Sequence, residues 1–155
     1  RRTRDGSGTH GRRSRLVTVG QVRLPRAIAD AILAHARAEA PLEACGLIPG
    51  SGYAADAGEP LRYVPCRNAL ASPVRYTVHP EDLLRVTVEA DDAGGVIWGI
   101  VHSHVRSPAV PSPTDVDLAY YPDAVYLLVS LAEEPALRAW RIADGSCREV
   151  DLDLA

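Results

Sequence analysis

The 155-residue sequence contains no lysine, no methionine and no phenylalanine, and it has only three cysteines. All 17 basic residues are therefore arginines. Three scattered cysteines exclude both a disulfide framework and a zinc ribbon, since a ribbon needs paired Cys-X-X-Cys segments. Without phenylalanine the core has to be built from Leu, Val, Ile, Ala and Tyr. The hydrophobic content of 46% is sufficient for one domain of this length.

Long apolar runs are also missing. No stretch of about 18 apolar residues is present, so we expect no membrane-spanning helix. The N-terminus lacks the apolar segment of a secretory signal as well, and we therefore expect a cytoplasmic protein.

The net charge of −3 conceals an uneven distribution. Residues 1–15 hold six arginines and a single acid, and we predict that they form a disordered tail ahead of one domain over residues 16–155. That domain has 11 arginines against 19 acids, which argues against nucleic-acid binding because such domains carry a basic face. A tail that contacts RNA is the alternative for residues 1–15.

Two histidines follow an apolar run, 95–101, that is typical of a buried strand. Side chains alternate along a strand, so His102 and His104 project from the same face and can bind one metal ion. Asp115, beyond a proline-rich loop, is a plausible third donor. Three protein donors leave one position for water, as in catalytic zinc sites. The structural alternative is a half-buried pair of histidines without metal.

Two further polar segments have structural explanations of their own. Ser112-Pro113-Thr114-Asp115 is a favourable helix start, with serine at the N-cap and proline at the first helical position. Glu43 precedes a strand-like apolar run, where most glutamates simply face solvent.

The combination of these segments is more specific than any one of them. Glu43 ahead of Cys45-Gly46, then His102-X-His104, then Ser112 and Asp115 resemble the JAMM signature. That signature marks the zinc isopeptidase branch of the Mov34/MPN/PAD-1 family, and the match extends over about residues 21–154.

Further segments resemble the small bacterial members of this family. They are 122–124, leading into the apolar run 126–130, and 141–145. These members include enzymes of the Mec type, which act on ubiquitin-like sulfur carriers and release cysteine. The chain departs at Val105, where many eukaryotic members have proline; this affects the shape of the loop and leaves the ligand set intact.

The resemblance implies a role for each of the five residues. His102, His104 and Asp115 would bind Zn²⁺, and Glu43 would act as general base on water at the metal. Ser112 would donate to the oxyanion. The implied activity is that of a zinc metalloprotease hydrolysing the amide bond after the Gly-Gly tail of a ubiquitin-like β-grasp protein, which is the expected partner. A homodimer is also allowed.

We expect the fold to be a single-domain α/β sandwich with a mixed central sheet flanked by helices, as in the MPN and cytidine-deaminase architecture. Strands are predicted at 16–24, 61–64, 76–78, 95–104, 124–131, 137–142 and 146–152, with a further strand after Glu43. Helices are predicted at 25–40, at 80–93, and from Ser112 to the residue before Pro122.

Several assignments keep an alternative. Cys45 faces the core or approaches the metal, and His35 packs or is solvated rather than binding metal. Residues 68–76 are expected to form a wall of the substrate site. The rival functions are a non-catalytic MPN scaffold, whose members usually lack the ligands, and a nucleobase deaminase. The deaminase needs His-X-Glu and Pro-Cys-X-X-Cys segments that this sequence does not contain.

Overall fold

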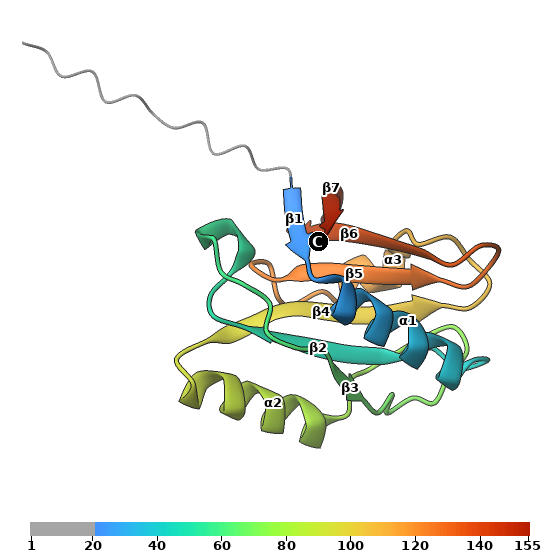
Figure 1. Ribbon diagram of the computed structural model, residues 1–155. Coiled ribbons are helices and arrows are strands. Elements are labelled where there is room, and N and C mark those ends of the chain that lie inside the picture. The colour runs from blue at the N-terminus through green and yellow to red at the C-terminus, as the bar shows by residue number, and fades with distance from the viewer. Residues whose placement is uncertain (1–20) are drawn as a thin grey trace, which may run out of the picture.

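The apolar runs of the sequence assemble into one curled, seven-stranded mixed sheet in the computed structural model, which describes residues 21–155 (Figure 1). The strands are β1 (Gln21–Leu24), β2 (Cys45–Gly50), β3 (Val64–Cys66), β4 (Val96–His104), β5 (Val125–Ser130), β6 (Ala136–Ala143) and β7 (Ser146–Leu154). The helices are α1 (Arg26–Glu39), α2 (Pro80–Asp92) and α3 (Pro113–Asp117), with a 3-10 turn η1 (Ala54–Asp56). The expected α/β sandwich is confirmed.

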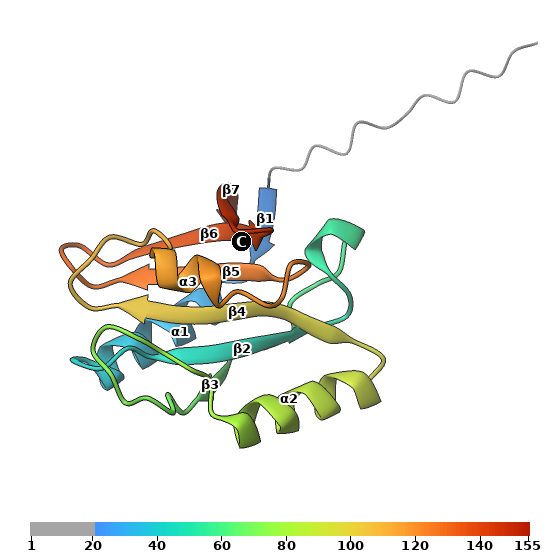
Figure 2. The same ribbon diagram turned by 180° about the vertical axis from the view of Figure 1, so that it is seen from behind.

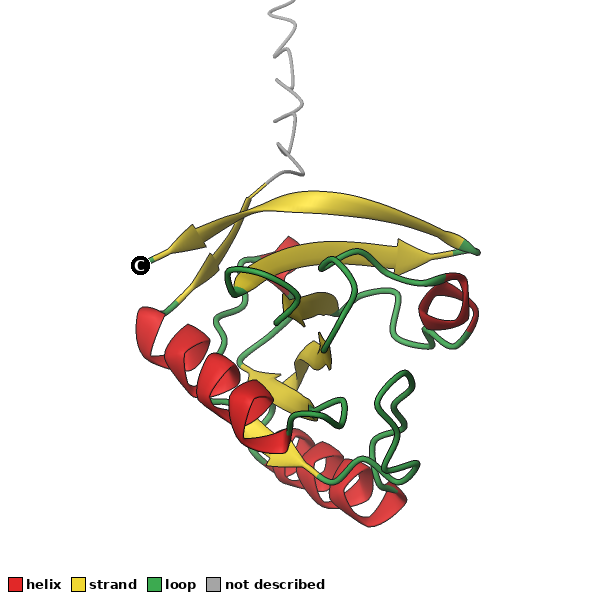
Figure 3. Cartoon of the chain, turned by 90° about the vertical axis from the view of Figure 1, so that its right-hand side faces the viewer, coloured by secondary structure: helices red, strands yellow, loops and turns green. Residues whose placement is uncertain are grey.

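The strand order is β1-β7-β6-β5-β4-β2-β3. The pairs β4–β5 and β1–β7 are parallel, and the other pairs are antiparallel. Figure 3 shows how strongly the sheet curls. The central partners β4 and β5 run side by side with Gly99 opposite Val125 and His104 opposite Ser130. This places the histidine-bearing end of β4 in the middle of the sheet.

Each face of the sheet is covered by a different helix. Ile28, Ile32 and Ala36 of α1 pack in one core cluster, as their four-residue spacing predicts, and Val86 and Ala90 of α2 pack in the other. Figure 2 shows α3 in front of β4 and β5, on the face opposite α1. In the described part of the chain, no helix is long and apolar enough to cross a membrane.

Strand β5 is buried on both faces, as its continuous apolar sequence predicts. Val125, Leu127 and Val129 belong to the cluster that contains α1, and Tyr126 and Leu128 belong to the cluster that contains α2. Successive side chains of β5 therefore pack alternately into the two core clusters on the two faces of the sheet.

The prediction of a strand at 61–64 was wrong, since β3 begins at Val64 and includes Pro65. Proline is tolerated there because β3 is the edge strand and pairs only with β2. Residues 76–78 also form no strand, and only an isolated bridge joins Val78 to Asn68.

The third helix is shorter than predicted, because α3 ends at Asp117 and does not continue to Pro122. Beyond this end the backbone N–H of Tyr121 donates to the hydroxyl of Tyr126 at 3.1 Å and not to a helical carbonyl. The first strand is described from Gln21 onward. Residues 16–20 of that prediction, and the tail predicted at 1–15, lie outside the described residues.

Candidate metal centre

Both histidines lie at the C-terminal end of strand β4, and their side chains point to the face of the sheet that α2 covers. Their side chains are nearly inaccessible, with relative exposures of 1% for His102 and 5% for His104. The two Nε2 atoms lie 3.3 Å apart. The pattern of alternate residues on one strand therefore brings two imidazole nitrogens to a common point, as predicted.

Asp115 reaches the same point from the first turn of α3. Its Oδ2 lies 3.2 Å from Nε2 of His102 and 3.1 Å from Nε2 of His104. The carboxylate is held by a capping box, in which Ser112 Oγ accepts from the Asp115 N–H at 3.0 Å and Asp115 Oδ2 accepts from the Ser112 N–H at 2.9 Å. The helix start and the candidate ligand are thus one structural unit.

Glu43 enters the site from the segment directly before β2. Glu43 is 3% exposed. One of its carboxylate oxygens lies within 4.8 Å of a ring nitrogen of His102 and of a ring nitrogen of His104. The backbone around it is fixed by hydrogen bonds, from the Glu43 N–H to Ser72 O at 2.9 Å and from Asn68 Nδ2 to Glu43 O at 3.1 Å. Because backbone bonds hold this segment, the carboxylate is left facing the histidines.

Ser103 anchors the same segment from the opposite face of β4. Its Oγ accepts a hydrogen bond from the backbone N–H of Ala44 at 2.8 Å, and its own N–H donates to Ala44 O at 3.0 Å. Ser103 is 1% exposed and Ala44 is 5% exposed. The residue between the two histidines therefore positions the neighbour of Glu43.

The two imidazoles differ in their outer contacts. His104 Nδ1 lies 2.7 Å from the carbonyl oxygen of Pro108, so this nitrogen carries the proton and Nε2 offers its lone pair to the site. His102 Nδ1 has no partner among the described residues, and its ring stacks on Tyr76 with centroids 4.2 Å apart. The contact of the Pro108 carbonyl with His104 and the stacking of Tyr76 on His102 were not predicted from the sequence.

Burial and neighbouring charges shift the pKa values of Glu43, His102 and Asp115. Burial raises the pKa of Glu43 to about 7, opposed by His104 and reinforced by Asp115. Burial also lowers the pKa of His102. Burial acts against the charged form of Asp115 too, but hydrogen bonds with both histidines outweigh it and hold its pKa below the usual range.

These residues fit a divalent cation. Two imidazole nitrogens and one carboxylate oxygen converge, and this donor set suits zinc. Glu43 Oε1 is buried and has no hydrogen-bond partner in the described part of the chain, which a group bound at the centre would satisfy. The arrangement can bind one cation and still leave a carboxylate beside it for proton transfer.

Two hollows border the centre. The larger one, of about 490 Å³, is lined by Glu43, His104 and Ser112 together with residues 41–42, 73–74 and 105–107. The smaller one, of about 280 Å³, is largely apolar. It is lined by Asp115, by four tyrosines, and by residues from the segments 75–78 and 114–121. The segment 68–76, which we predicted to form a substrate wall, contributes residues to both hollows.

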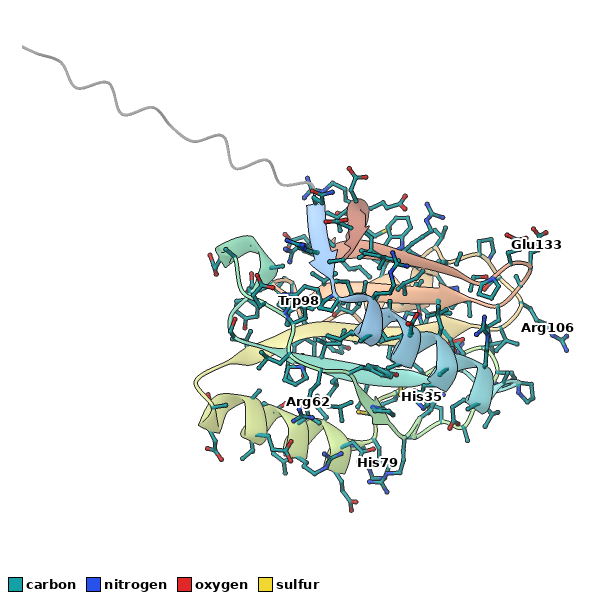
Figure 4. All side chains as sticks on the ribbon, in the orientation of Figure 1. His35, Arg62, His79, Trp98, Arg106 and Glu133 are labelled. Atoms are coloured by element: carbon teal, nitrogen blue, oxygen red, sulfur yellow. The ribbon has the colours of Figure 1, made fainter. Side chains whose placement is uncertain are left out.

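Cys45 and His35 take structural positions. The Cys45 thiol is 3.5 Å from the carbonyl oxygen of Arg67, and burial raises its pKa to about 12, as expected for an unreactive core cysteine. His35 Nδ1 lies 2.7 Å from the Tyr63 hydroxyl, and Figure 4 shows His35 on α1. His35 is part of the packing between α1 and the sheet.

Comparison with known proteins agrees with this geometry. Residues 25–143 match the family described as prokaryotic homologs of the JAB domain. A CysO-cysteine peptidase of Mycobacterium bovis is 40% identical over 124 residues, which cover 79% of this chain and 83% of the relative. A desampylase of Haloferax volcanii is 38% identical over 106 residues, covering 65% and 74% of the two chains.

A solved structure extends the likeness to the whole fold. The solution structure of a Desulfitobacterium hafniense protein superposes with a TM-score of 0.74 at 31% identity. The superposition covers 86% of this chain and 92% of that protein.

Proposed function

This chain belongs to the family of prokaryotic homologs of the JAB domain, and we propose that it is a zinc-dependent peptidase acting on a ubiquitin-like sulfur carrier. The bond cleaved is the amide that follows the carrier's C-terminal Gly-Gly. Relatives named CysO-cysteine peptidase and desampylase support a hydrolase of peptide or isopeptide bonds. The first of these names also supports cysteine as the group released.

One observation carries the proposal: a buried carboxylate, Glu43, stands beside three converging metal donors from two other segments. Glu43 lies nearly 60 residues before His102 in the sequence, and only the fold unites them. A structural histidine pair would not need a second, unpaired carboxylate in a buried position.

A zinc ion bound by His102, His104 and Asp115 would supply Lewis acidity, polarising a carbonyl and lowering the pKa of water toward about 7. Glu43 takes the proton from the attacking water and gives it to the leaving nitrogen. Burial raises the pKa of Glu43, which makes this carboxylate a better proton acceptor than an exposed glutamate. The net change is amide plus water to carboxylic acid plus amine.

Ser112 donates to the oxygen on which negative charge develops. Its Oγ uses an acceptor lone pair for the Asp115 N–H, so the hydroxyl proton is free for a second bond. Ser112 lines the same hollow as Glu43. Such a donor contributes about 100- to 1,000-fold in rate.

The smaller hollow supports binding of an extended Gly-Gly tail. It is bordered by residues 75–78 on one side and by residues of the α3 region on the other, and it reaches Asp115. An extended chain needs mainly backbone contacts and small residues near the reacting bond. Glycines at the end of the carrier satisfy this requirement.

The test is incubation with candidate carriers that bear a C-terminal extension, with and without chelator, followed by intact mass. We expect loss of the extension only without chelator. Glu43→Gln retains zinc and loses about 100- to 10,000-fold in turnover, because proton transfer is removed and the three donors are kept. Glu39→Gln, an exposed change at the end of α1, is the matched control and leaves turnover unchanged. Wild-type turnover by Glu43→Gln would refute the mechanism.

The rival function, a non-catalytic scaffold, makes a different prediction. Such a protein has no need of a complete donor set, so purified material would contain no stoichiometric zinc. One zinc per chain favours the peptidase.

A further inference from the structure

The two hollows beside the metal centre each contain one arginine and one carboxylate, but the carboxylates belong to residues with different roles. Among the described residues that line the larger hollow, Arg106 is the one guanidinium, standing with Glu43, His104 and the apolar side chains of Leu42 and Val74. The smaller hollow has its own arginine, Arg75, but does not include Glu43. The larger hollow thus joins the proton-transfer group to a fixed positive charge.

The chemistry of amide hydrolysis assigns a role to each hollow. The leaving nitrogen has to receive a proton from Glu43, so the leaving group lies on the side where Glu43 is exposed to the hollow. Glu43 and Ser112 line the larger hollow, whereas Asp115 lines the smaller one. The released group therefore occupies the larger hollow, and the Gly-Gly tail occupies the smaller one.

Arg106 is available for a ligand. Five other arginines of the described chain are ion-paired, but the Arg106 guanidinium has neither an ion pair nor a hydrogen bond within residues 21–155. Figure 4 shows its side chain extending outward beyond the end of β4. It therefore stands at the rim of the hollow, where an incoming anion meets it first.

The backbone on both sides of Arg106 is held in place. His104 Nδ1 bonds to Pro108 O at 2.7 Å, and Ser130 Oγ donates to Ser107 O at 2.7 Å. The loop that carries Arg106 is thus tied both to a candidate metal ligand and to β5. The backbone of Arg106 is therefore fixed beside the larger hollow, and its exposed side chain can reach a ligand bound there.

We propose that the larger hollow is the leaving-group pocket and that Arg106 binds the free α-carboxylate of a single released amino acid. This inference rests on the proposed peptidase function. In an amino acid the carboxylate is two bonds from the nitrogen that leaves, so the group that Glu43 protonates and the group that Arg106 binds are close together. The side chain of a lysine in an isopeptide would bring an aliphatic chain and no carboxylate to this position. Arg106 therefore selects carriers that end in one extra residue.

The test uses a Gly-Gly carrier ligated to cysteine in two forms, one with the free C-terminal carboxylate and one with a carboxamide. The wild type is expected to cleave the acid roughly five- to tenfold better than the amide in kcat/KM, the value of one partly exposed charge-assisted contact. Arg106→Gln brings the acid-to-amide ratio to about one, and Arg106→Lys restores part of it.

Arg75→Gln is the matched control, because it removes an arginine from the other hollow; it keeps the wild-type acid-to-amide ratio. Thermal melts establish that each variant is folded. A wild-type ratio near one, or a wild-type ratio kept by Arg106→Gln, overturns the role of Arg106 and leaves the peptidase intact. Cleavage of neither form by the wild type, with zinc bound, overturns the proposed function as well.

Discussion

Replacing Ser103 by alanine tests how the fold positions Glu43. The Ser103 hydroxyl accepts the Ala44 N–H at 2.8 Å, and both residues are almost fully buried. Removal of the hydroxyl leaves a buried backbone N–H without a partner, which costs about 1–3 kcal/mol. For a chain of this size a loss of about 2 kcal/mol lowers the Tm by roughly 6 °C.

The same substitution is expected to affect catalysis. Ala44 is the residue after Glu43, so release of its N–H lets the carboxylate move relative to the histidines. A displacement of about 1 Å can cost 100-fold in rate, and we expect kcat to fall about 10- to 100-fold with zinc still bound.

The assay combines thermal denaturation, metal analysis and turnover of a carrier substrate. Ser146→Ala is the control, because Ser146 is exposed and its hydroxyl bonds only to a nearby carbonyl at 3.2 Å; its Tm should stay within about 2 °C of the wild type. An unchanged Tm for Ser103→Ala would refute the energetic reasoning. A lowered Tm with unchanged kcat would show that Glu43 is positioned by other contacts.

Two other predictions concern the metal and the stability of the fold. His104→Ala and Asp115→Asn each remove one donor, so zinc measured by mass spectrometry should fall to background and turnover should be lost; stoichiometric zinc in both variants would place the ligands elsewhere. Asp82 accepts from the Arg67 N–H at 2.8 Å and from Arg67 Nε at 3.1 Å, and these bonds lower its pKa to about 2. Because the folded-state pKa is depressed, this stabilisation is present above about pH 4 and is lost as the pH falls toward 2. Asp82→Asn should therefore lower the free energy of unfolding in urea by about 1 kcal/mol at pH 7, allowing for solvent screening, and by much less at pH 3; an equal loss at both pH values would contradict the assignment to ionisation.

Helices and buried strands were predictable where local pattern and tertiary burial agree. The stripe of Ile28, Ile32 and Ala36 placed α1, and the unbroken apolar sequence of β5 marked a strand covered on both faces. The prediction was wrong at β3 and at the end of α3 because hydrophobic periodicity reports neither the position of a strand in the sheet nor a side-chain bond to the backbone. An edge position tolerates Pro65, and a hydroxyl on β5 takes the N–H of Tyr121.

The site shows the same division. Alternation along one strand was enough to place His102 and His104 together, and the serine-proline start of α3 was enough to predict its cap. The contacts that support the ligands were not predictable. Tyr76, the carbonyl of Pro108 and the partnership of Ser103 with Ala44 have no signature in the sequence, because each depends on which segments the sheet brings side by side.

The sequence by itself determined the donor types, their spacing on one strand and at one helix start, and the family to which those residues point, because these are properties of local periodicity and of side-chain chemistry. Only the tertiary structure decided that Glu43 stands unpaired beside the histidines, that two hollows meet at the centre, and that Arg106 borders the one containing Glu43. These depend on strand order and on the path of the loops, which are fixed by long-range packing in the two layers of the core.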